Sequence, residues 1–260
     1  MVLPIHDDNP TRRIPWVTYL LIVINLVVFL LEPISRLAID GDPPIAQACR
    51  QEAFFRRWGA IPRELSSGKQ HNETFAPAGT ESCEVVRPSY RKSPVLSVLY
   101  ALFLHGGWLH LIGNMLFLFV FGNNVEDRLG RLAFLAFYLV SGYVATYVFA
   151  FSDPQSLSTL VGASGAIAGV LGAYLVLFPR ARVLSLVPFL LFLPFRLPAW
   201  VVLGSWFALQ YVYSRGAALT AGSGVAYSAH VAGFVFGFLA LLAGRRRLAQ
   251  HPRSAYGGRR

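Results

Sequence analysis

The chain has 260 residues, of which 55% are hydrophobic and only 14% are charged, and its mean hydropathy is +0.50. A soluble domain usually carries about 25% charged residues, and only three of the 13 acidic residues here, Glu126, Asp127 and Asp153, lie beyond residue 84. This composition excludes intrinsic disorder and an ordinary cytosolic enzyme. It favours an all-α polytopic membrane protein, embedded in a lipid bilayer.

The net charge of +10 could suggest a nucleic-acid partner, but the placement of the basic residues argues against one. They cluster at the ends of apolar segments, at Arg12 and Arg13, at Arg180 and Arg182, and at residues 245–247. Membrane proteins place positive charge in this way on the cytoplasmic side. We therefore expect no nucleic-acid partner.

The first apolar run begins after Arg13 and ends at Leu31. It is too long for a signal-peptide core and has no small-x-small cleavage site, so it predicts a retained first transmembrane helix within residues 14–33. Residues 1–13 form a short N-terminal segment. Residues 34–93 contain nine Lys/Arg and seven Asp/Glu, and this polar composition predicts a long aqueous loop.

The remaining apolar runs lie within residues 94–245. The stretch 183–195 is apolar but short and contains two prolines, so we interpret it as interfacial or re-entrant rather than spanning. Five further spans give a six-transmembrane-helix bundle in total. We predict these five at about 108–125, 132–151, 161–178, 197–213 and 225–244.

Six spans place both termini on one side of the membrane. The short loops after the second and fourth spans carry two and three Lys/Arg, and those after the third and fifth carry none and one. The positive-inside rule then makes both termini cytoplasmic, including the basic tail 246–260, and turns the long first loop outward. The short N-terminus without a transit peptide favours a prokaryotic inner membrane. Cys49 and Cys83 both lie in the outward loop, and the sequence leaves open a disulfide or two free thiols.

Polar residues inside spans are costly and are functional candidates by default. His110 and Asn114 are four residues apart, on one helix face, and Ser164 and His230 lie in glycine-containing segments of the fourth and sixth spans. Taken singly, the serine reads as a small packing residue, and the others read as interhelical hydrogen-bonding groups. In the predicted topology, however, all three helices present these groups at one depth below the outer surface.

Together these residues suggest nucleophilic chemistry. Ser164 is a weak nucleophile unless a base within hydrogen-bond reach takes its proton, and a neutral His230 can be that base. His110, Asn114 and the backbone N–H of Ser164 can donate hydrogen bonds to an oxyanion. None of the predicted spans carries an Asp or Glu to orient the histidine, so the arrangement would be a dyad.

Glycines are placed so that the fourth and sixth spans can approach each other closely. Gly162 and Gly165 bracket Ser164 and permit a tight entry into the fourth span. Small-xxx-small ridges, which allow close helix contact in lipid, occur in both spans: Gly165 with Gly169, and Gly233 with Gly237.

With these motifs assembled, the sequence resembles the rhomboid family of intramembrane serine proteases. The similar segments are His105-Gly-Gly-Trp-Leu-His110-Leu-Ile-Gly-Asn114, Glu126-Asp-Arg-Leu-Gly130, Gly162-Ala-Ser164-Gly165 and Ala229-His230-Val-Ala-Gly233-Phe-Val-Phe-Gly237. The resemblance covers roughly residues 95–245. It implies a six-helix core and cleavage of membrane-protein substrates in or near a transmembrane segment. It also implies Ser164 as nucleophile, His230 as general base, and an oxyanion hole of His110, Asn114 and the Ser164 amide.

Two features depart from the resemblance. The first loop has Arg57-Trp58, where many family members have the reverse order, Trp-Arg. Some family members place a tyrosine four residues after the nucleophile, against the histidine, whereas this sequence has Ala168 there. We therefore expect the ring of His230 to be supported from elsewhere in the fold.

Two other functions compete with an active protease. One is a catalytically inactive rhomboid-like protein that binds transmembrane clients, which the intact Ser164 and His230 disfavour. The other is a proton-coupled transporter with His105, His110 and His230 as a relay, which the lack of intramembrane Asp or Glu disfavours. We expect no cofactor and no metal, because His105 and His110 are five residues apart with no accompanying Glu. The oligomeric state and the physiological substrate are not predictable from these patterns.

Overall fold

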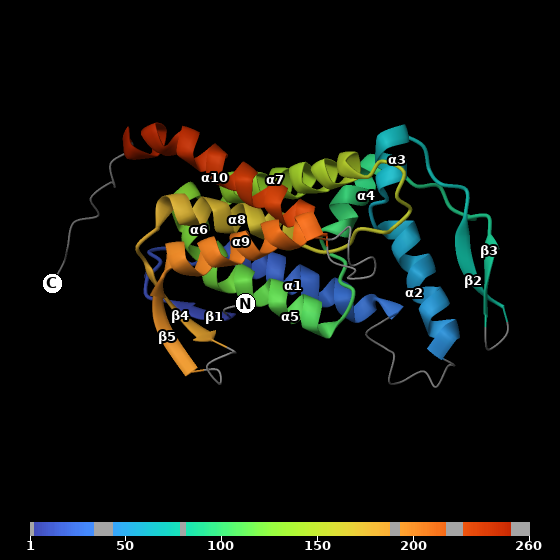
Figure 1. Ribbon diagram of the computed structural model, residues 1–260, viewed down its shortest axis with the longest axis horizontal. Coiled ribbons are helices and arrows are strands. Elements are labelled where there is room, and N and C mark those ends of the chain that lie inside the picture. The colour runs from blue at the N-terminus through green and yellow to red at the C-terminus, as the bar shows by residue number, and fades with distance from the viewer. Residues whose placement is uncertain (1–2, 34–43, 79–81, 188–192, 217–225, 251–260) are drawn as a thin grey trace.

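The computed structural model describes residues 3–33, 44–78, 82–187, 193–216 and 226–250. This part of the chain is mostly helical, with the long helices lying roughly side by side (Figure 1). The helices are α1 (Trp16–Leu31), α2 (Pro44–Trp58), α3 (Pro62–Ser67), α4 (Pro94–Ala101), α5 (Trp108–Phe117), the π-helical turn η2 (Leu118–Gly122), α6 (Asn123–Leu129), α7 (Arg131–Ser152), α8 (Ser164–Leu177), α9 (Ala199–Gly216) and α10 (Tyr227–Gln250). The strands are β1 (Leu3–Asp7), β2 (Thr74–Ala78), β3 (Ser82–Val86), β4 (Arg182–Val187) and β5 (Leu193–Pro198).

Three of the described helical stretches are long and apolar enough to cross a membrane: Trp108–Leu129, Arg131–Ser152 and Tyr227–Gly244. They coincide with the predicted second, third and sixth spans. Helices α1 and α8 are apolar but shorter. The predicted fourth span of 161–178 begins too early, because α8 starts only at Ser164. The preceding Gly162 has φ +124°, a backbone conformation that an α-helix does not contain.

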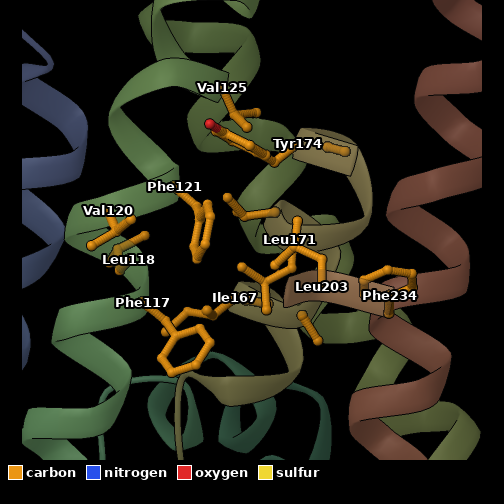
Figure 2. Close-up of a cluster of buried hydrophobic side chains, with 14 of the residues drawn as sticks. Phe117, Leu118, Val120, Phe121, Val125, Ile167, Leu171, Tyr174, Leu203 and Phe234 are labelled. Atoms are coloured by element: carbon orange, nitrogen blue, oxygen red, sulfur yellow. The ribbon is translucent and has the colours of Figure 1, made fainter. Parts of the chain in front are cut away.

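Helix α8 is the central helix of the bundle. It is buried on all sides along most of its length, as expected of a helix without a polar face. Aromatic side chains from neighbouring helices pack against it: Phe121 meets the ring of Tyr174 edge-on, with ring centroids 4.9 Å apart. Figure 2 shows these rings together with Leu171, Leu203 and Phe234. The core therefore holds the first residue of α8, Ser164, at a defined position.

Two small β-sheets correct the all-α expectation. At one end of the bundle, β1 pairs antiparallel with β4, which pairs with β5, so that Leu3 lies opposite Leu186 (Figure 1). The stretch 183–195 was expected not to span the membrane, and its described parts form most of β4 and the first half of β5, while residues 188–192 lie outside the described residues. This sheet could not be predicted from local sequence, because the N-terminal strand pairs with a segment about 180 residues away.

The N-terminal strand is also tied to the helices. Asp7 accepts hydrogen bonds from the Tyr174 hydroxyl at 2.6 Å and from Asn124 Nδ2 at 2.8 Å. Asp8 forms an ion pair with Arg196 at 2.8 Å. Burial raises the pKa of the Asp7 carboxyl above its ordinary value of 3.8, against the lowering effect of its hydrogen bond with Tyr174.

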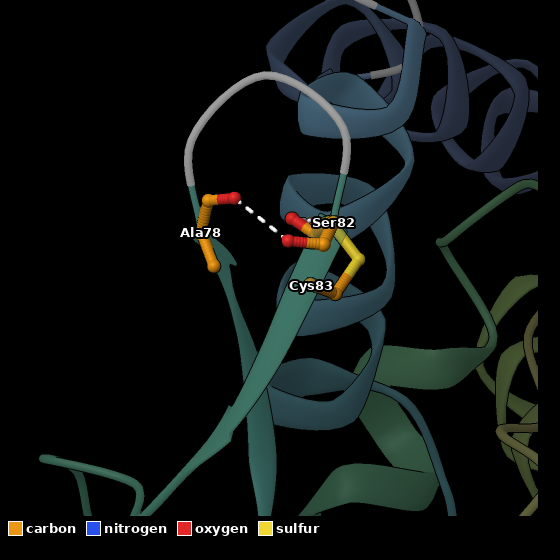
Figure 3. The surroundings of a disulfide bond; sticks show 4 residues. Ala78, Ser82 and Cys83 are labelled. Atoms are coloured by element: carbon orange, nitrogen blue, oxygen red, sulfur yellow. Dashed lines mark hydrogen bonds between the residues drawn. A yellow bond between two sulfur atoms is a disulfide. The ribbon is translucent and has the colours of Figure 1, made fainter.

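The predicted first loop is folded where it is described. Helices α2 and α3 and the β2–β3 hairpin lie at the end of the molecule opposite the three-stranded sheet (Figure 1). Cys49 of α2 is bonded to Cys83 of β3, with the Cα atoms 5.7 Å apart, and Ser82 donates a hydrogen bond to the Ala78 carbonyl beside the bridge (Figure 3). The alternative left open by the sequence is thereby resolved in favour of the disulfide. Residues 34–43 and 79–81 of the loop, and 251–260 of the tail, lie outside the described residues.

Candidate active site

The entry into α8 is a strained turn that only glycine fits. Gly162 has φ +124°, and a Cβ built on it would lie 2.8 Å and 2.9 Å from Cε1 and Nε2 of His110. Its backbone N–H donates to the carbonyl of Ala101 at 2.8 Å, which anchors the turn to α4. As a result the side chains of His110 and Ser164 face the same small space.

Ser164 and His230 are in direct contact. The Oγ of Ser164 lies 2.8 Å from Nε2 of His230, although the two residues are 66 positions apart. Ser164 is the first residue of α8 and His230 is the fourth residue of α10, so both lie at the same end of neighbouring helices. With Nε2 unprotonated, the serine hydroxyl donates to it, which is the arrangement a general base requires.

Glycines bring α8 and α10 into backbone contact. A Cβ on Gly233 would collide with the carbonyl of Gly165, and a Cβ on Gly237 would collide with the carbonyl of Gly169. Ala168 is fully buried in the same interface, and its Cβ would lie 3.3 Å from a Cβ on Gly233. A larger side chain at position 168 would have to displace its neighbours, because Ala168 is fully buried.

Groups that can donate hydrogen bonds also lie around Ser164. The backbone N–H of Gly106 donates to His110 Nδ1 at 3.3 Å, so the neutral ring carries its proton on Nε2, the atom near Gly162. Asn114 lies one helical turn further along α5, and its Nδ2 is buried without a hydrogen-bond partner among the described residues. The amide of Ser164 opens α8 and is among the N–H groups that a helix leaves unpaired. All three donors suit an oxyanion.

A cavity of about 790 Å³ joins these groups. Its lining contains no Asp, Glu, Lys or Arg among the described residues, and includes Ser164, His230, His110, Asn114 and Gly162. Apolar side chains make up most of the rest of the wall. Such a site suits a largely uncharged chain segment bound beside a few polar groups.

Sequence reasoning missed two residues of α9. Gln210 is 6% exposed, and its Oε1 lies 2.8 Å from Nδ1 of His230. The ring centroid of Trp206 lies 6.0 Å from that of His230, with 33° between the planes. The signal for Gln210 was present, because it is an amide in a predicted span, where polar side chains are costly.

His105 does not line the cavity. It is fully buried, its ring centroid lies 5.1 Å from that of His110, and its backbone N–H donates to Glu32 at 3.1 Å. It therefore packs against His110 from outside the cavity. Among the residues that the structure describes, no group of three or more His, Cys, Asp or Glu could hold a metal ion.

Comparison with known proteins points to one family. The chain is 34% identical over 151 residues to "Rhomboid protein 1, mitochondrial" of Saccharomyces cerevisiae, covering 55% of this chain and 40% of that protein. It is 40% identical over 78 residues to "RHOMBOID-like protein 5" of Arabidopsis thaliana, covering 30% and 25% of the two chains. It is 34% identical over 93 residues to "Presenilin-associated rhomboid-like protein A, mitochondrial" of Danio rerio, covering 35% and 24%.

The matches span less than half the length of these curated relatives. The pattern of the Rhomboid domain, in contrast, matches residues 92–247, more than half of this chain. That range contains all the residues of the cavity wall. The resemblance noted in the motifs is thus confirmed, and the chain is an integral membrane protein that belongs to the rhomboid family.

Proposed function

We propose that this protein is an intramembrane serine endopeptidase that cleaves membrane-protein substrates in or near a transmembrane segment. The observation that carries the proposal is the 2.8 Å contact between Ser164 Oγ and His230 Nε2 in a cavity lined with oxyanion donors. A serine that served only as a small packing residue would not require a base at hydrogen-bond distance. A relative from Bacillus subtilis that is named as a rhomboid protease, and is 41% identical over 75 residues, covering 28% of this chain and 36% of that protein, supports the reaction class.

The reaction follows from the geometry. His230 Nε2 takes the hydroxyl proton as Ser164 Oγ attacks the scissile carbonyl carbon. The carbonyl oxygen becomes an oxyanion, which accepts hydrogen bonds from His110 Nε2, Asn114 Nδ2 and the Ser164 amide. The protonated His230 then gives its proton to the leaving amine, and the C–N bond breaks. A water molecule, deprotonated by His230, attacks the acyl-enzyme and regenerates the serine.

We also propose the membrane arrangement. Six spans within residues 14–33 and 94–245, both termini in the cytoplasm and an outward-facing first loop place the dyad end of the bundle on the outer side. The disulfide of the loop supports this orientation, because such bridges persist in oxidising compartments. The basic segments at residues 1–13 and 246–260 then lie on the inner side.

The test is proteolysis by the purified full chain in detergent or liposomes. The substrate is a single-span protein with small residues near the outer end of its span. We expect cleavage by the wild type and loss of about 10³-fold or more in Ser164→Ala and His230→Ala. A fluorophosphonate should label the wild type and not Ser164→Ala. Equal cleavage by all three proteins would overturn the proposal, and absence of cleavage and labelling in a folded wild type would favour the inactive, client-binding alternative.

A further inference from the structure

We propose that Gln210 is a positioning residue that fixes the ring orientation and the tautomer of His230, so that the dyad works with a neutral third member. The inference rests on the proposed protease function. It is carried by the 2.8 Å contact between Gln210 Oε1 and His230 Nδ1, made between two helices and 20 residues apart in the chain. Gln210 lies within the cavity wall and is almost fully buried.

The chemistry requires a partner on that side of the ring. A neutral imidazole carries one proton, and Nε2 must be free of it to accept the serine proton. The proton must therefore lie on Nδ1, where it needs an acceptor, since a buried N–H without one is destabilising. Gln210 Oε1 supplies the acceptor. With Nδ1 held in this way, Nε2 on the opposite edge of the ring points at Ser164 Oγ.

Among the described side chains, Gln210 alone lies within hydrogen-bond distance of His230 Nδ1. The rings that surround His230 are those of Trp206, at 6.0 Å, and Tyr227, on the same helix, at 6.4 Å between centroids. Trp206 limits tilting of the ring but offers no acceptor in its plane. His110 faces the site from α5, on the side of the oxyanion donors.

An amide suits this site better than a carboxylate in one respect. A carboxylate would bring a charge into a cavity that holds no described Lys or Arg to balance it, and burial of an unpaired charge is costly. An amide also has a weakness, because its NH₂ group could instead donate to Nδ1 and favour the wrong tautomer. The orientation of the Gln210 amide therefore selects between a competent and an incompetent dyad.

Helix α9 thereby takes part in catalysis without supplying a catalytic residue. Its position is set by packing of Trp206 against Phe117 and Phe234, at 6.3 Å and 6.1 Å between ring centroids. A displacement of α9 that removes Gln210 from His230 would release the imidazole while leaving the α8–α10 contact in place. The dyad is thus oriented only when α9 is packed.

Variants of the full chain test the inference by kinetics. Gln210→Leu keeps the size but removes the acceptor, and we expect kcat to fall about tenfold to a hundredfold with KM changed by less than about twofold. Gln210→Glu keeps an acceptor beside Nδ1, so we expect its kcat to exceed that of Gln210→Leu. Its unfolding midpoint should be lower than that of the wild type, because no described Lys or Arg of the cavity balances the added charge. Ser214→Ala, on the same helix but away from the cavity, is the matched control. Unfolding midpoints confirm that the variants are folded.

The tautomer is measured independently of proteolysis by ¹⁵N NMR of histidine-labelled protein, with the His230 signals assigned by their loss in His230→Ala. We expect the Nδ1–H tautomer in the wild type and a mixture in Gln210→Leu. A cleaving wild type with the Nε2–H tautomer, or a Gln210→Leu variant with unchanged kcat and tautomer, would overturn the inference and leave the protease function intact. A wild type that does not cleave, with the Nδ1–H tautomer present, would instead overturn the proposed function.

Discussion

Substitution of Gly237 by alanine tests whether the α8–α10 contact sets the catalytic geometry. Gly237 lies two turns beyond His230 on α10, and a Cβ there would collide with the carbonyl oxygen of Gly169. An ordinary Cβ contact begins at 3.4 Å, so the two backbones would have to separate by on the order of 1 Å. The neighbouring backbone contact of Gly233 with Gly165 leaves little freedom for a local adjustment.

The consequence for the dyad follows from its short hydrogen bond. Adding about 1 Å to the 2.8 Å between Ser164 Oγ and His230 Nε2 exceeds the limit of a hydrogen bond. A misplacement of this size costs about 10²-fold in rate, and the overpacked interface should also lose about 1–3 kcal/mol of stability. We therefore expect Gly237→Ala to remain folded with a lower unfolding midpoint and about 1% of wild-type cleavage.

The assay compares initial rates of cleavage of a single-span substrate with thermal unfolding in the same detergent. Gly244→Ala is the matched control, because it lies on the same helix and a Cβ there meets no atom within 4 Å among the described residues. The control should cleave at the wild-type rate. Wild-type cleavage by Gly237→Ala would refute the reasoning that glycine contacts hold the serine and histidine at reacting distance.

Three further predictions concern stability. Glu126 is 2% exposed, and its carboxylate accepts two backbone N–H bonds and one hydroxyl bond at the start of α1. Glu126→Gln should therefore lower the free energy of unfolding by about 1–3 kcal/mol. An unchanged unfolding midpoint would contradict this. Replacing both Cys49 and Cys83 by serine removes a disulfide that joins residues 34 positions apart. We expect this change to destabilise the first loop by about 2–4 kcal/mol. Limited proteolysis of the loop should be faster in the variant, and equal rates would refute the prediction. Because burial raises the pKa of Asp7 above 3.8, its contribution to stability is fully present below pH 3.8 and is lost as the pH rises through the folded-state pKa. Asp7→Asn should remove this slope from the pH dependence of unfolding, and an identical slope in the variant would disprove the assignment.

The coarse architecture could be predicted because a bilayer imposes strong rules on local sequence. Three predicted spans match helices long and apolar enough to cross a membrane, since some 20 apolar residues in a row have few other stable uses. The three-stranded sheet could not be predicted in this way. Its strands β1 and β4 are separated by most of the chain, and each is too short for its residue pattern to indicate which strand it pairs with.

The candidate site divides in the same manner. Ser164 and His230 could be predicted from the sequence in combination with His110 and Asn114, because polar side chains in apolar spans are costly and rare. The glycines beside Ser164 and His230 indicate close helix contact. Only the tertiary structure decided which nitrogen of His230 faces the serine. It also decided that Gln210, and not a residue at position 168, contacts the other nitrogen of the ring. Both depend on the rotation and separation of three packed helices, quantities that arise from contacts between distant residues and leave no periodic trace in the sequence.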